Sequence, residues 1–382
     1  MPKNLTSFQI SEHNVIEYLN TLNIGLPLNQ KDITVEIRPA KNFNLLVSLP
    51  SGEKLLVKQE RQTEDGKTFE ELINEWKFRC FIKENSRLNF LEQQIPKVFH
   101  FSSIDSILVV EYLDKYEDLS ELYVKETRFP LIIPQNLGNI LANLHKFSSH
   151  CDRCKNSFQP NFIYTDVVRE LDQVRPEIFG MFSPDGIKFV TLYQRYDSLR
   201  QAIADLRANW SPTCLVHGDF KLNNILCLSE IFNKNAEESK EKHISNSAIR
   251  VIDWERCCWG DPVHDFGTLI ASYLLIWFNS LVIDNSISIN ESLKMAAVPL
   301  DLLQPSIKAF YESYIEVFPE LLEERPDLQK QIVQHTGFSL IRQIQAALQY
   351  EHRLGNLSIC MLQVAKSLLC RPGEFIPTIF GK

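Results

Sequence analysis

CLVHGDFKLNNIL, residues 214–226, is the stretch that decides how this chain is interpreted. Its apolar start predicts a strand, and His217, Asp219 and Asn224 follow at the spacing H-x-D-x-x-x-x-N before apolar residues return. A surface loop needs polar residues but no fixed spacing between them. A catalytic loop needs both, because a proton acceptor and a metal ligand must be held at defined positions. The motif is a weak signal by itself, so its meaning depends on the rest of the chain.

The composition is that of a globular protein without a basic excess. The chain has 382 residues, of which 44% are hydrophobic and 23% charged, and this length suits two lobes with a substantial core. A net charge of −8 is atypical of a general nucleic-acid-binding protein, so we expect no nucleic-acid partner. The most apolar stretch, residues 267–283, is interrupted by polar side chains and is short for a membrane span, so it predicts a buried helix.

The cysteines point to a reducing compartment. Nine cysteines form no regular framework and no secretory signal is evident, so we expect free thiols and a cytoplasmic protein. The cluster HCDRC, residues 150–154, resembles half of a zinc site, but a structural site needs four ligands and no second pair at zinc spacing follows. We expect a mobile surface connection there, with zinc or redox chemistry as the minor alternative.

The first third of the sequence predicts a small mixed lobe. A helix with Ser11 as its N-cap is expected over residues 11–22, and the spacing over residues 69–85 is that of an amphipathic helix. Strand-like segments with a hairpin turn at Ser51-Gly52 complete the lobe. These segments are residues 33–40, 43–50, 53–60, 95–103 and 106–114.

Helical periodicity dominates from Asn136 onward. Residues 137–148 and 190–210 predict one helix each, and most of the chain after Asp265 is helical by period. The fold class predicted by this order is α+β, with a β-rich lobe in residues 1–112 and a helical lobe in residues 113–382.

A second segment, residues 249–267 (IRVIDWERCCWGDPVHDFG), supplies a metal ligand. Its predicted strand ends at Asp253, and a carboxylate at a strand end is a natural ligand for Mg²⁺. Asn224 can add an amide oxygen, which leaves Asp219 to accept the proton of a hydroxyl group. This division of roles is that of phosphoryl transfer.

Phosphoryl transfer also requires a strand lysine and a helix glutamate. Lys58 follows three apolar residues in a predicted strand, and a lysine buried there needs a charged partner and an anionic ligand. Glu75 in the predicted helix is the candidate partner, with Glu71 one turn earlier as the alternative.

HGDFKLNN, VIDWE and GDPVHDFG together resemble the aminoglycoside phosphotransferase family, close to choline kinases and the wider protein-kinase-like fold. The resemblance covers roughly residues 43–314 and implies a bilobal enzyme whose first lobe binds ATP or GTP and whose second lobe holds the acceptor. It implies Asp219 as catalytic base, Asn224 and Asp253 as Mg²⁺ ligands, and Lys58 as a contact for the nucleotide phosphates. His217 would then support the catalytic loop.

The resemblance assigns further residues to supporting roles. Glu111 and Leu113 fall in the hinge segment whose backbone would bind the adenine. Asp261 and Asp265 would be structural and cap a helix at Phe266.

Two departures from the family pattern stand out. The glycine-rich phosphate loop is absent from AKNFNLLV, residues 40–47, so Asn42 or Asn44 would have to replace it. The polar insertion at residues 229–247 is expected to bulge as a loop without disturbing the metal site.

The acceptor is the least determined part of the prediction. We expect a hydroxyl of an aminoglycoside, amino alcohol or sugar-like molecule, whereas a peptide Ser/Thr kinase of natural-product maturation and an inactive binding scaffold are the alternatives. The intact set of catalytic residues argues against the scaffold. Candidates for an acidic acceptor pocket are Glu312, Glu316, Glu320, Glu323 and Glu324. Arg342, His352 and Arg353 would instead suit an anionic or peptide acceptor.

Overall fold

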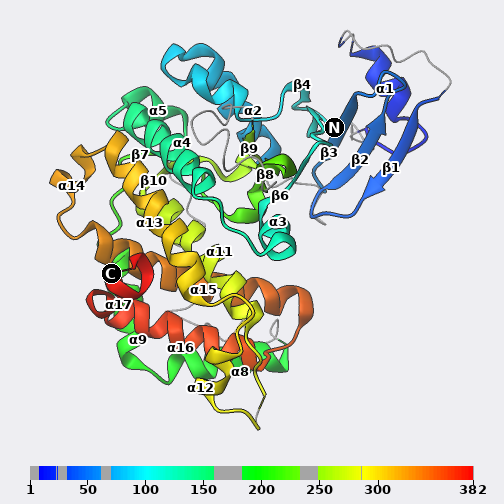
Figure 1. The fold of residues 1–382 in the computed structure, drawn as a ribbon. Helices are drawn as coiled ribbons and strands as arrows, with labels where there is room; N and C mark the ends of the chain where they lie inside the picture. Colours follow the sequence, from blue (N-terminus) through cyan, green and yellow to red (C-terminus); the bar gives the residue numbers. More distant parts are fainter. Residues whose placement is uncertain are drawn as a thin grey trace, which may run out of the picture. The chain divides into compact units, whose positions relative to one another are not determined.

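The structure is a computed structural model that describes residues 8–22, 24, 32–61, 70–158, 183–232, 248–284 and 286–381 (Figure 1). The chain divides into two units that interleave along the sequence. The first unit comprises Met1–Glu117, Leu226–Ser229 and Ser245–Cys257, and the second comprises Asp118–Ile225, Glu230–Ile244 and Cys258–Lys382. The division at residue 112 into a nucleotide lobe and an acceptor lobe stays a prediction, because chain compactness does not test where ligands bind.

The first unit is built on an antiparallel sheet. Its five strands have the order β1-β2-β3-β5-β4, which confirms the predicted β-rich region. The strands are β1 (Thr34–Arg38), β2 (Phe43–Ser48), β3 (Lys54–Gln59), β4 (Val98–Ser102) and β5 (Ile107–Glu111). The predicted hairpin turn joins β2 and β3, where Gly52 has a φ of +87° that a residue with a side chain rarely adopts.

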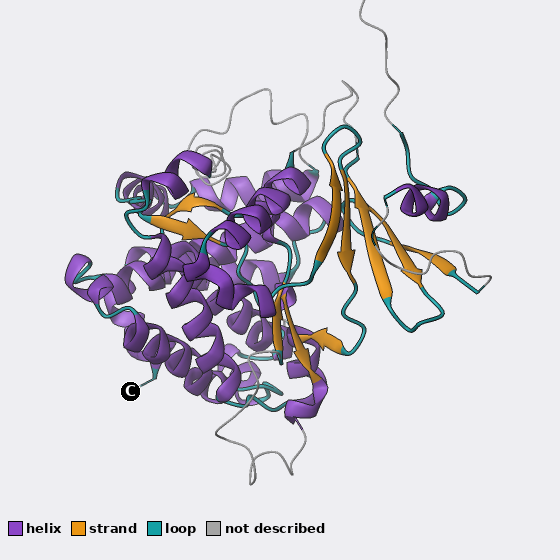
Figure 2. Cartoon of the chain, turned by 90° about the horizontal axis from the view of Figure 1, so that it is seen from above, coloured by secondary structure: helices purple, strands orange, loops and turns teal. Residues whose placement is uncertain are grey.

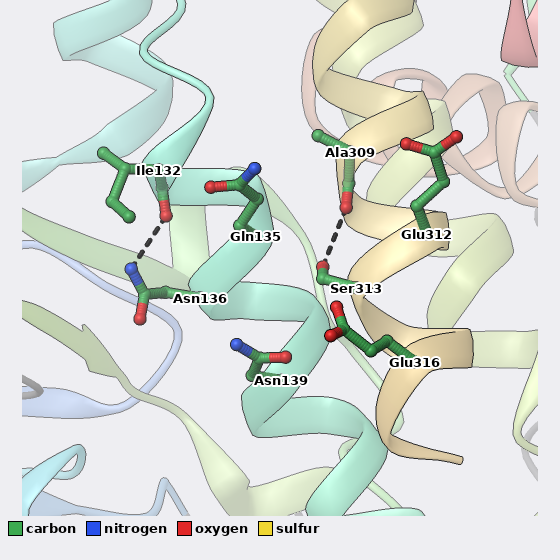
Figure 3. Close-up of a pocket in the computed structure, with 8 residues that line it drawn as sticks. All are labelled: Ile132, Gln135, Asn136, Asn139, Ala309, Glu312, Ser313 and Glu316. Carbon is green, nitrogen blue, oxygen red and sulfur yellow. Dashed lines mark hydrogen bonds between the residues drawn. The ribbon is translucent and has the colours of Figure 1, made fainter. Parts of the chain in front are cut away.

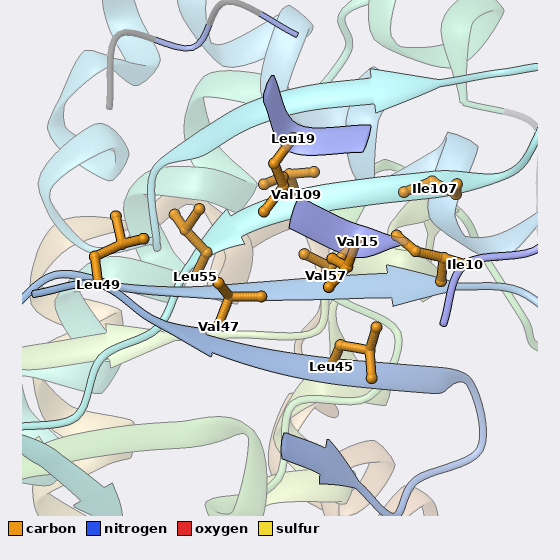
Figure 4. Close-up of a cluster of buried hydrophobic side chains, with 10 residues drawn as sticks. All are labelled: Ile10, Val15, Leu19, Leu45, Val47, Leu49, Leu55, Val57, Ile107 and Val109. Carbon is orange, nitrogen blue, oxygen red and sulfur yellow. The ribbon is translucent and has the colours of Figure 1, made fainter. Parts of the chain in front are cut away.

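Side-chain alternation gives the sheet two buried faces. Val57 belongs to the cluster that packs against helix α1 (Val15–Thr21), as Figure 4 shows. Figure 2 draws the strands of this sheet in orange. Leu108 belongs to a second cluster with Leu72 of helix α2 (Glu71–Glu84). Because Lys58 follows Val57 and pairs in register with Leu108, its side chain lies on the α2 face of the sheet.

Helix α1 begins later than its sequence indicates. Asn14, not Ser11, is the N-cap residue, and its side-chain oxygen accepts a hydrogen bond from the Ser11 N–H at 2.7 Å. The predicted N-cap was wrong. Serine and asparagine are both common N-cap residues, so the sequence could not distinguish Ser11 from Asn14. The predicted helix over residues 69–85 is confirmed as α2, although Phe69 lies outside the described residues.

A small second sheet follows in the order β6-β8-β9, formed by Tyr116–Asp118, Ile225–Leu228 and Ile249–Val251. Beyond β9, the short 3₁₀ turn Trp254–Arg256 begins with a fully buried tryptophan. Its ring stacks on Phe78 of α2 with ring centroids 4.1 Å apart. This stacking fixes the segment after Asp253 against α2.

The second unit is mainly helical. Strand β7 (Cys214–Val216) pairs antiparallel with β10 (Cys258–Gly260), and the catalytic-loop sequence follows β7. The helices are α3 (Leu119–Glu126), α4 (Ile132–Ser148), α5 (Asp152–Ser157), α8 (Pro184–Gln194), α9 (Asp197–Ala208), α11 (Val263–Ser280), α12 (Ile289–Lys294), α13 (Leu300–Val317), α14 (Glu320–Glu324), α15 (Leu328–Glu351), α16 (Asn356–Cys370) and α17 (Pro372–Phe380).

Two helix predictions in this unit need correction. The single helix expected over residues 190–210 is two helices, because Tyr196 has extended backbone (φ −112°, ψ 98°) between α8 and α9. The helix expected to begin at Leu137 already begins at Ile132, since Pro134 is tolerated in a first turn.

Helix α11 confirms the buried helix predicted from the most apolar stretch. It packs closely on α15, since a Cβ on Gly267 would lie 2.5 Å from the carbonyl carbon of His335. In the described part of the chain, no helix has the length and apolar character needed to cross a membrane.

Candidate functional site

Lys58 lies between two carboxylates in the first unit. Its Nζ is 2.9 Å from Asp253 Oδ1 and 3.5 Å from Glu75 Oε2, and only 9% of the residue is exposed. Burial by itself would lower the pKa of Lys58, but the charges of Asp253 and Glu75 outweigh it and raise the pKa. The structure therefore holds a permanently charged ammonium group on the α2 face of the sheet.

The two glutamates considered as partners of Lys58 have separate roles. Glu75 is 3% exposed and faces Lys58, whereas Glu71 pairs with Lys41 at 2.5 Å. One turn after Glu75, the buried Arg79 adds a second cation, and burial lowers its pKa to about 10. No sequence signal singled out Arg79, because its position only continues the buried side of α2.

Asp253 has an unusual backbone conformation. It is a left-handed residue with φ +58° and ψ +57°, a conformation that aspartate adopts more readily than most residues. The side chain of Asn74 in α2 donates hydrogen bonds to the carbonyls of Glu255 (2.9 Å) and Cys257 (2.6 Å). Asn74 thus anchors the turn that presents the carboxylate of Asp253.

Glu255 adds a further acidic group to this part of the first unit. The pKa of Glu255 is raised to about 7, mainly by burial and also by the nearby charges of Glu71 and Asp253, while the charge of Lys58 acts in the opposite direction. The folded protein therefore favours the neutral acid, whereas the unfolded chain ionises near the ordinary value of 4.5. Ionisation of Glu255 costs stability progressively as the pH rises from that value through about 7.

We expect Glu255→Gln to stabilise the ligand-free protein more at pH about 8 than at about 5. Glutamine imitates the neutral acid, so it removes the buried charge at the higher pH and changes little at the lower one. Thermal unfolding at both pH values, without metal or nucleotide, measures the difference. An equal shift at the two pH values would contradict the raised pKa of Glu255.

The catalytic-loop sequence is held by Asp265 in the second unit. Its carboxylate accepts hydrogen bonds from the N–H groups of His217 (2.7 Å) and Gly218 (3.0 Å). His145 Nε2 lies 3.3 Å from the same carboxylate, and His145 Nδ1 lies 2.9 Å from the Tyr314 hydroxyl. Burial opposes ionisation of Asp265, but the hydrogen bond from His145 and the nearby histidines keep its pKa below the ordinary value.

The predicted cap at Phe266 was therefore wrong for Asp265, which lies inside α11 and positions the loop. Asp261 does contribute at the start of this helix, where its Oδ1 accepts from the Val263 N–H at 3.2 Å. Asp261 also pairs with the buried Arg325 at 2.8 Å. Both carboxylates are structural, as expected, but the capping role belongs to Asp261.

Asp219 is positioned by its neighbours in the loop. Its N–H donates to His217 Nδ1 at 3.2 Å, so the fully buried His217 supports the backbone. Asn224 Nδ2 donates to the carbonyl oxygen of Asp219 at 2.9 Å and lies 3.2 Å from its Oδ2. Because the amide nitrogen of Asn224 faces Asp219, its amide oxygen is the atom suited to a metal ion.

Lys221 is a charged residue of the loop that the sequence analysis missed. Its Nζ lies 2.8 Å from Asp219 Oδ2, and the side chain is 29% exposed. The signal was present as a lysine two positions after the aspartate. Position alone did not show that the side chain turns back toward the carboxylate.

The roles of the proposed phosphate-loop and hinge residues stay predictions, and the structure shows the following contacts at these positions. Asn44 pairs in register with Lys58, and its buried Oδ1 has no hydrogen-bond partner among the described residues. The Glu111 carboxylate accepts from the Lys97 N–H at 3.1 Å, which orients it toward β4. The Leu113 carbonyl accepts from the Tyr116 N–H at 3.1 Å. Asn42 is described but makes no contact that bears on a phosphate loop.

The remaining charged candidates are dispersed over the second unit. Glu320 pairs with Lys146 at 2.9 Å, and Glu324 lies 3.4 Å from His150. Glu312 and Glu316 line a cavity between α4 and α13 (Figure 3). Arg342 lies within α15, while His352 and Arg353 follow its end. In the insertion, Ser229–Phe232 forms a 3₁₀ turn, and residues 233–247 lie outside the described part of the chain.

The HCDRC cluster forms the start of α5. The Cys154 N–H donates to Cys151 Sγ at 3.3 Å, so Cys151 serves as the N-cap. Among the residues that the structure describes, no group of three or more His, Cys, Asp or Glu side chains is arranged to hold a metal ion.

We expect the double change Cys151→Ser and Cys154→Ala to leave turnover unchanged and to lower stability by only about 1 kcal/mol. Cys154 is buried, so the cost arises from packing. Zinc analysis of the purified protein provides the check: one bound zinc per chain that disappears in the double variant would contradict this expectation.

Comparison with known proteins confirms the fold. No family model matches the sequence, and no curated protein matches it. A solved structure of a choline/ethanolamine kinase family protein from Mesorhizobium loti matches at a TM-score of 0.50 and 14% identity, covering 96% of this chain and 99% of that one. The GDP and kanamycin complex of APH(2")-IIia matches at a TM-score of 0.50 and 13% identity, covering 92% and 97%. The chain therefore has the α+β kinase-like fold that its sequence predicts.

Proposed function

We propose that this chain is a phosphotransferase that moves the γ-phosphoryl group of ATP or GTP to a hydroxyl group of a small molecule. The observation that carries the proposal is the Lys58–Glu75–Asp253 arrangement of the first unit, on the elements that phosphoryl transfer requires. Asp253 and Glu75 keep the buried ammonium group of Lys58 charged, which is the state that binds nucleotide phosphates. The catalytic loop of the second unit adds an aspartate whose neighbours fix its position.

Each residue has a role that follows from its chemistry. Lys58 binds the nucleotide phosphates, and Glu75 orients its ammonium group. Asp219 accepts the proton of the acceptor hydroxyl as the phosphoryl group arrives. Lys221 balances the charge of Asp219, and its positive charge would favour an anionic phosphoryl group next to that carboxylate.

Each unit offers an oxygen donor of the kind that magnesium prefers. Asp253 offers a carboxylate that is 40% exposed, and Asn224 offers an amide oxygen. Magnesium prefers oxygen ligands and takes few of them from the protein, since the nucleotide phosphates supply others. A bound Mg²⁺ would neutralise the charge of the phosphates during transfer.

A small-molecule acceptor agrees with the neighbours of similar fold. The solved structures concerned are a choline/ethanolamine kinase family protein and a complex with kanamycin, both kinase-like in fold. A peptide acceptor remains the second candidate, because the exposed His352 and Arg353 follow the end of α15. The complete set of Lys58, Asp219, Asn224 and Asp253 argues against an inactive scaffold.

Acceptor-dependent release of ADP or GDP tests the proposal. The purified chain is incubated with Mg²⁺ and nucleotide against aminoglycosides, amino alcohols, sugars and hydroxyl-bearing peptides. We expect at least one small hydroxyl compound to stimulate nucleotide turnover, and the Asp219→Asn variant to lose that stimulation. Stimulation by peptides alone would favour the second candidate.

Removal of divalent metal should abolish turnover. Asp253 and Asn224 supply oxygen and no nitrogen or sulfur ligands, so Mg²⁺ or Mn²⁺ should restore activity after EDTA treatment, and Zn²⁺ should not. Turnover is measured as a function of free metal concentration. Full activity after exhaustive chelation would remove Asp253 and Asn224 from their assigned roles.

A further inference from the structure

The loop between β1 and β2 presents a lysine to helix α2. Arg38 pairs in register with Asn44, and residues 39–42 connect the two strands. Lys41 stands in this connection, and its Nζ donates to both carboxylate oxygens of Glu71, the first residue of α2, at 2.5 Å. A flexible cationic side chain thus joins the loop to the start of the helix.

The Lys41–Glu71 pair lies in the same charged region of the first unit as Lys58. Asn44, three residues after Lys41, pairs in register with Lys58, so the side chains of Asn44 and Lys58 share the α2 face of the sheet. The charges of Glu71 and Lys58 both act on the carboxyl group of Glu255. An anion that reaches the ammonium group of Lys58 therefore enters the region in which Lys41 and Glu71 also act.

The composition of the loop favours a side-chain contact with an anion over a backbone contact. Backbone N–H groups approach a phosphate most closely where glycines leave room, and residues 39–42 contain no glycine. Pro39 also has no N–H group to donate. Lys41 is the one residue of these four whose side chain carries a positive charge.

The Lys41–Glu71 pair is of a kind that can exchange partners. The side chain of Lys41 is 45% exposed, and an exposed ion pair contributes little to stability. Glu71 lies in the first turn of α2, where the helix dipole continues to stabilise its negative charge after the lysine has left. A polyphosphate carries several negative charges, so it attracts the ammonium group more strongly than one carboxylate does.

We propose that Lys41 is a second phosphate-binding cation of the nucleotide site, in addition to Lys58, and that Glu71 holds Lys41 in the ligand-free chain. This role depends on the nucleotide site of the proposed phosphotransferase. When the nucleotide binds, Lys41 exchanges the carboxylate of Glu71 for a phosphate oxygen, and no covalent bond forms or breaks. Glu71 therefore opposes nucleotide binding, whereas Lys41 favours it.

A purely structural ion pair predicts a different result. If the contact only tied the loop to α2, Lys41→Met and Glu71→Gln would change nucleotide affinity in the same direction, because either substitution breaks the contact. An exchange of partners predicts effects of opposite sign.

The test is a double-mutant cycle on the full chain without acceptor. Isothermal titration calorimetry measures the binding of ATP and of GTP, each with Mg²⁺, at about 0.15 M salt. The variants are Lys41→Met, Glu71→Gln and the two changes combined. The matched controls, Lys54→Met and Glu53→Gln, remove the same charges at the far end of the β2–β3 hairpin, about 17 Å of strand away from the loop. Melting temperatures show that each variant is folded.

For the nucleotide that binds more tightly, we expect Lys41→Met to weaken binding about fivefold or more. Glu71→Gln should tighten binding about two- to fivefold, since Lys41 is then available to the phosphates. The double variant should bind as Lys41→Met does, because Glu71 has no lysine left to hold. Both controls should bind as the wild type does.

Three results would overturn this role of Lys41 while the wild type still binds nucleotide. These are an unchanged affinity in Lys41→Met, weaker binding in both single variants, and an equal tightening by Glu71→Gln with and without Lys41, which is a general effect of charge. A wild type that binds neither nucleotide would overturn the proposed phosphotransferase function as well.

Discussion

Asp219→Asn is expected to lower turnover by roughly 10²- to 10⁴-fold, the usual effect of removing a general base. Asparagine has nearly the same shape as aspartate and can still accept hydrogen bonds from Lys221 and Asn224. It cannot take a proton, so the change isolates that role from packing. Turnover with a confirmed acceptor and the affinity for nucleotide are measured on the same preparation.

A structural role for Asp219 predicts the opposite pattern. A carboxylate that only holds the loop would lower the melting temperature on replacement and leave turnover close to normal. The matched control is Asp265→Asn, because Asp265 accepts the N–H groups of His217 and Gly218 from inside the fold. We expect Asp265→Asn to lower the melting temperature more than Asp219→Asn does. A fall in turnover of less than about tenfold in Asp219→Asn would remove this loop from catalysis.

Lys58→Met is expected to raise the Michaelis constant for the nucleotide by about 10- to 100-fold, the effect of losing one hydrogen bond to a charged group. Methionine keeps most of the side-chain volume but carries no positive charge for the phosphates. Turnover should also fall, since Glu75 and Asp253 lose the cation between them. Nucleotide saturation curves and nucleotide affinity separate the two effects.

Lys54→Met provides the control for this experiment. Lys54 begins the same strand and pairs with Asp114 at 3.0 Å near the surface, so its loss removes one charge from β3 without removing the buried one. Its nucleotide kinetics should match those of the wild type. Unfolding midpoints of both variants are needed, because a buried pair that loses one partner is destabilised. Unchanged nucleotide kinetics in Lys58→Met would show that another cation binds the phosphates.

The strands of the first unit could be predicted because their signals are local. Alternation of apolar residues and the Ser51-Gly52 turn determine β2 and β3, and both depend only on neighbouring residues. The break between α8 and α9 had no such signal, since neither proline nor glycine stands near Tyr196 and the helical period continues across it. Helix ends of this kind depend on packing that the sequence does not display.

The site shows the same limit. The spacing of His217, Asp219 and Asn224 was readable, as was the position of Lys58 in a strand. The hydrogen bonds that the loop N–H groups donate to Asp265 join residues 47 and 48 positions apart, so a local sequence pattern could not predict them. Lys221 was missed for a different reason: its neighbours in sequence were known, but its side-chain direction was not.

The measurement that tests the central claim most directly follows the phosphoryl group itself. The chain is incubated with Mg²⁺, the acceptor panel and ATP whose γ-phosphoryl group carries ¹⁸O in its non-bridging positions, and products are examined by mass spectrometry. The account predicts a phosphorylated small molecule that retains the label, formed by the wild type and almost absent with Asp219→Asn. Two results would contradict the account: label found only in inorganic phosphate, or a labelled phosphorylated product formed equally by the wild type and by Asp219→Asn.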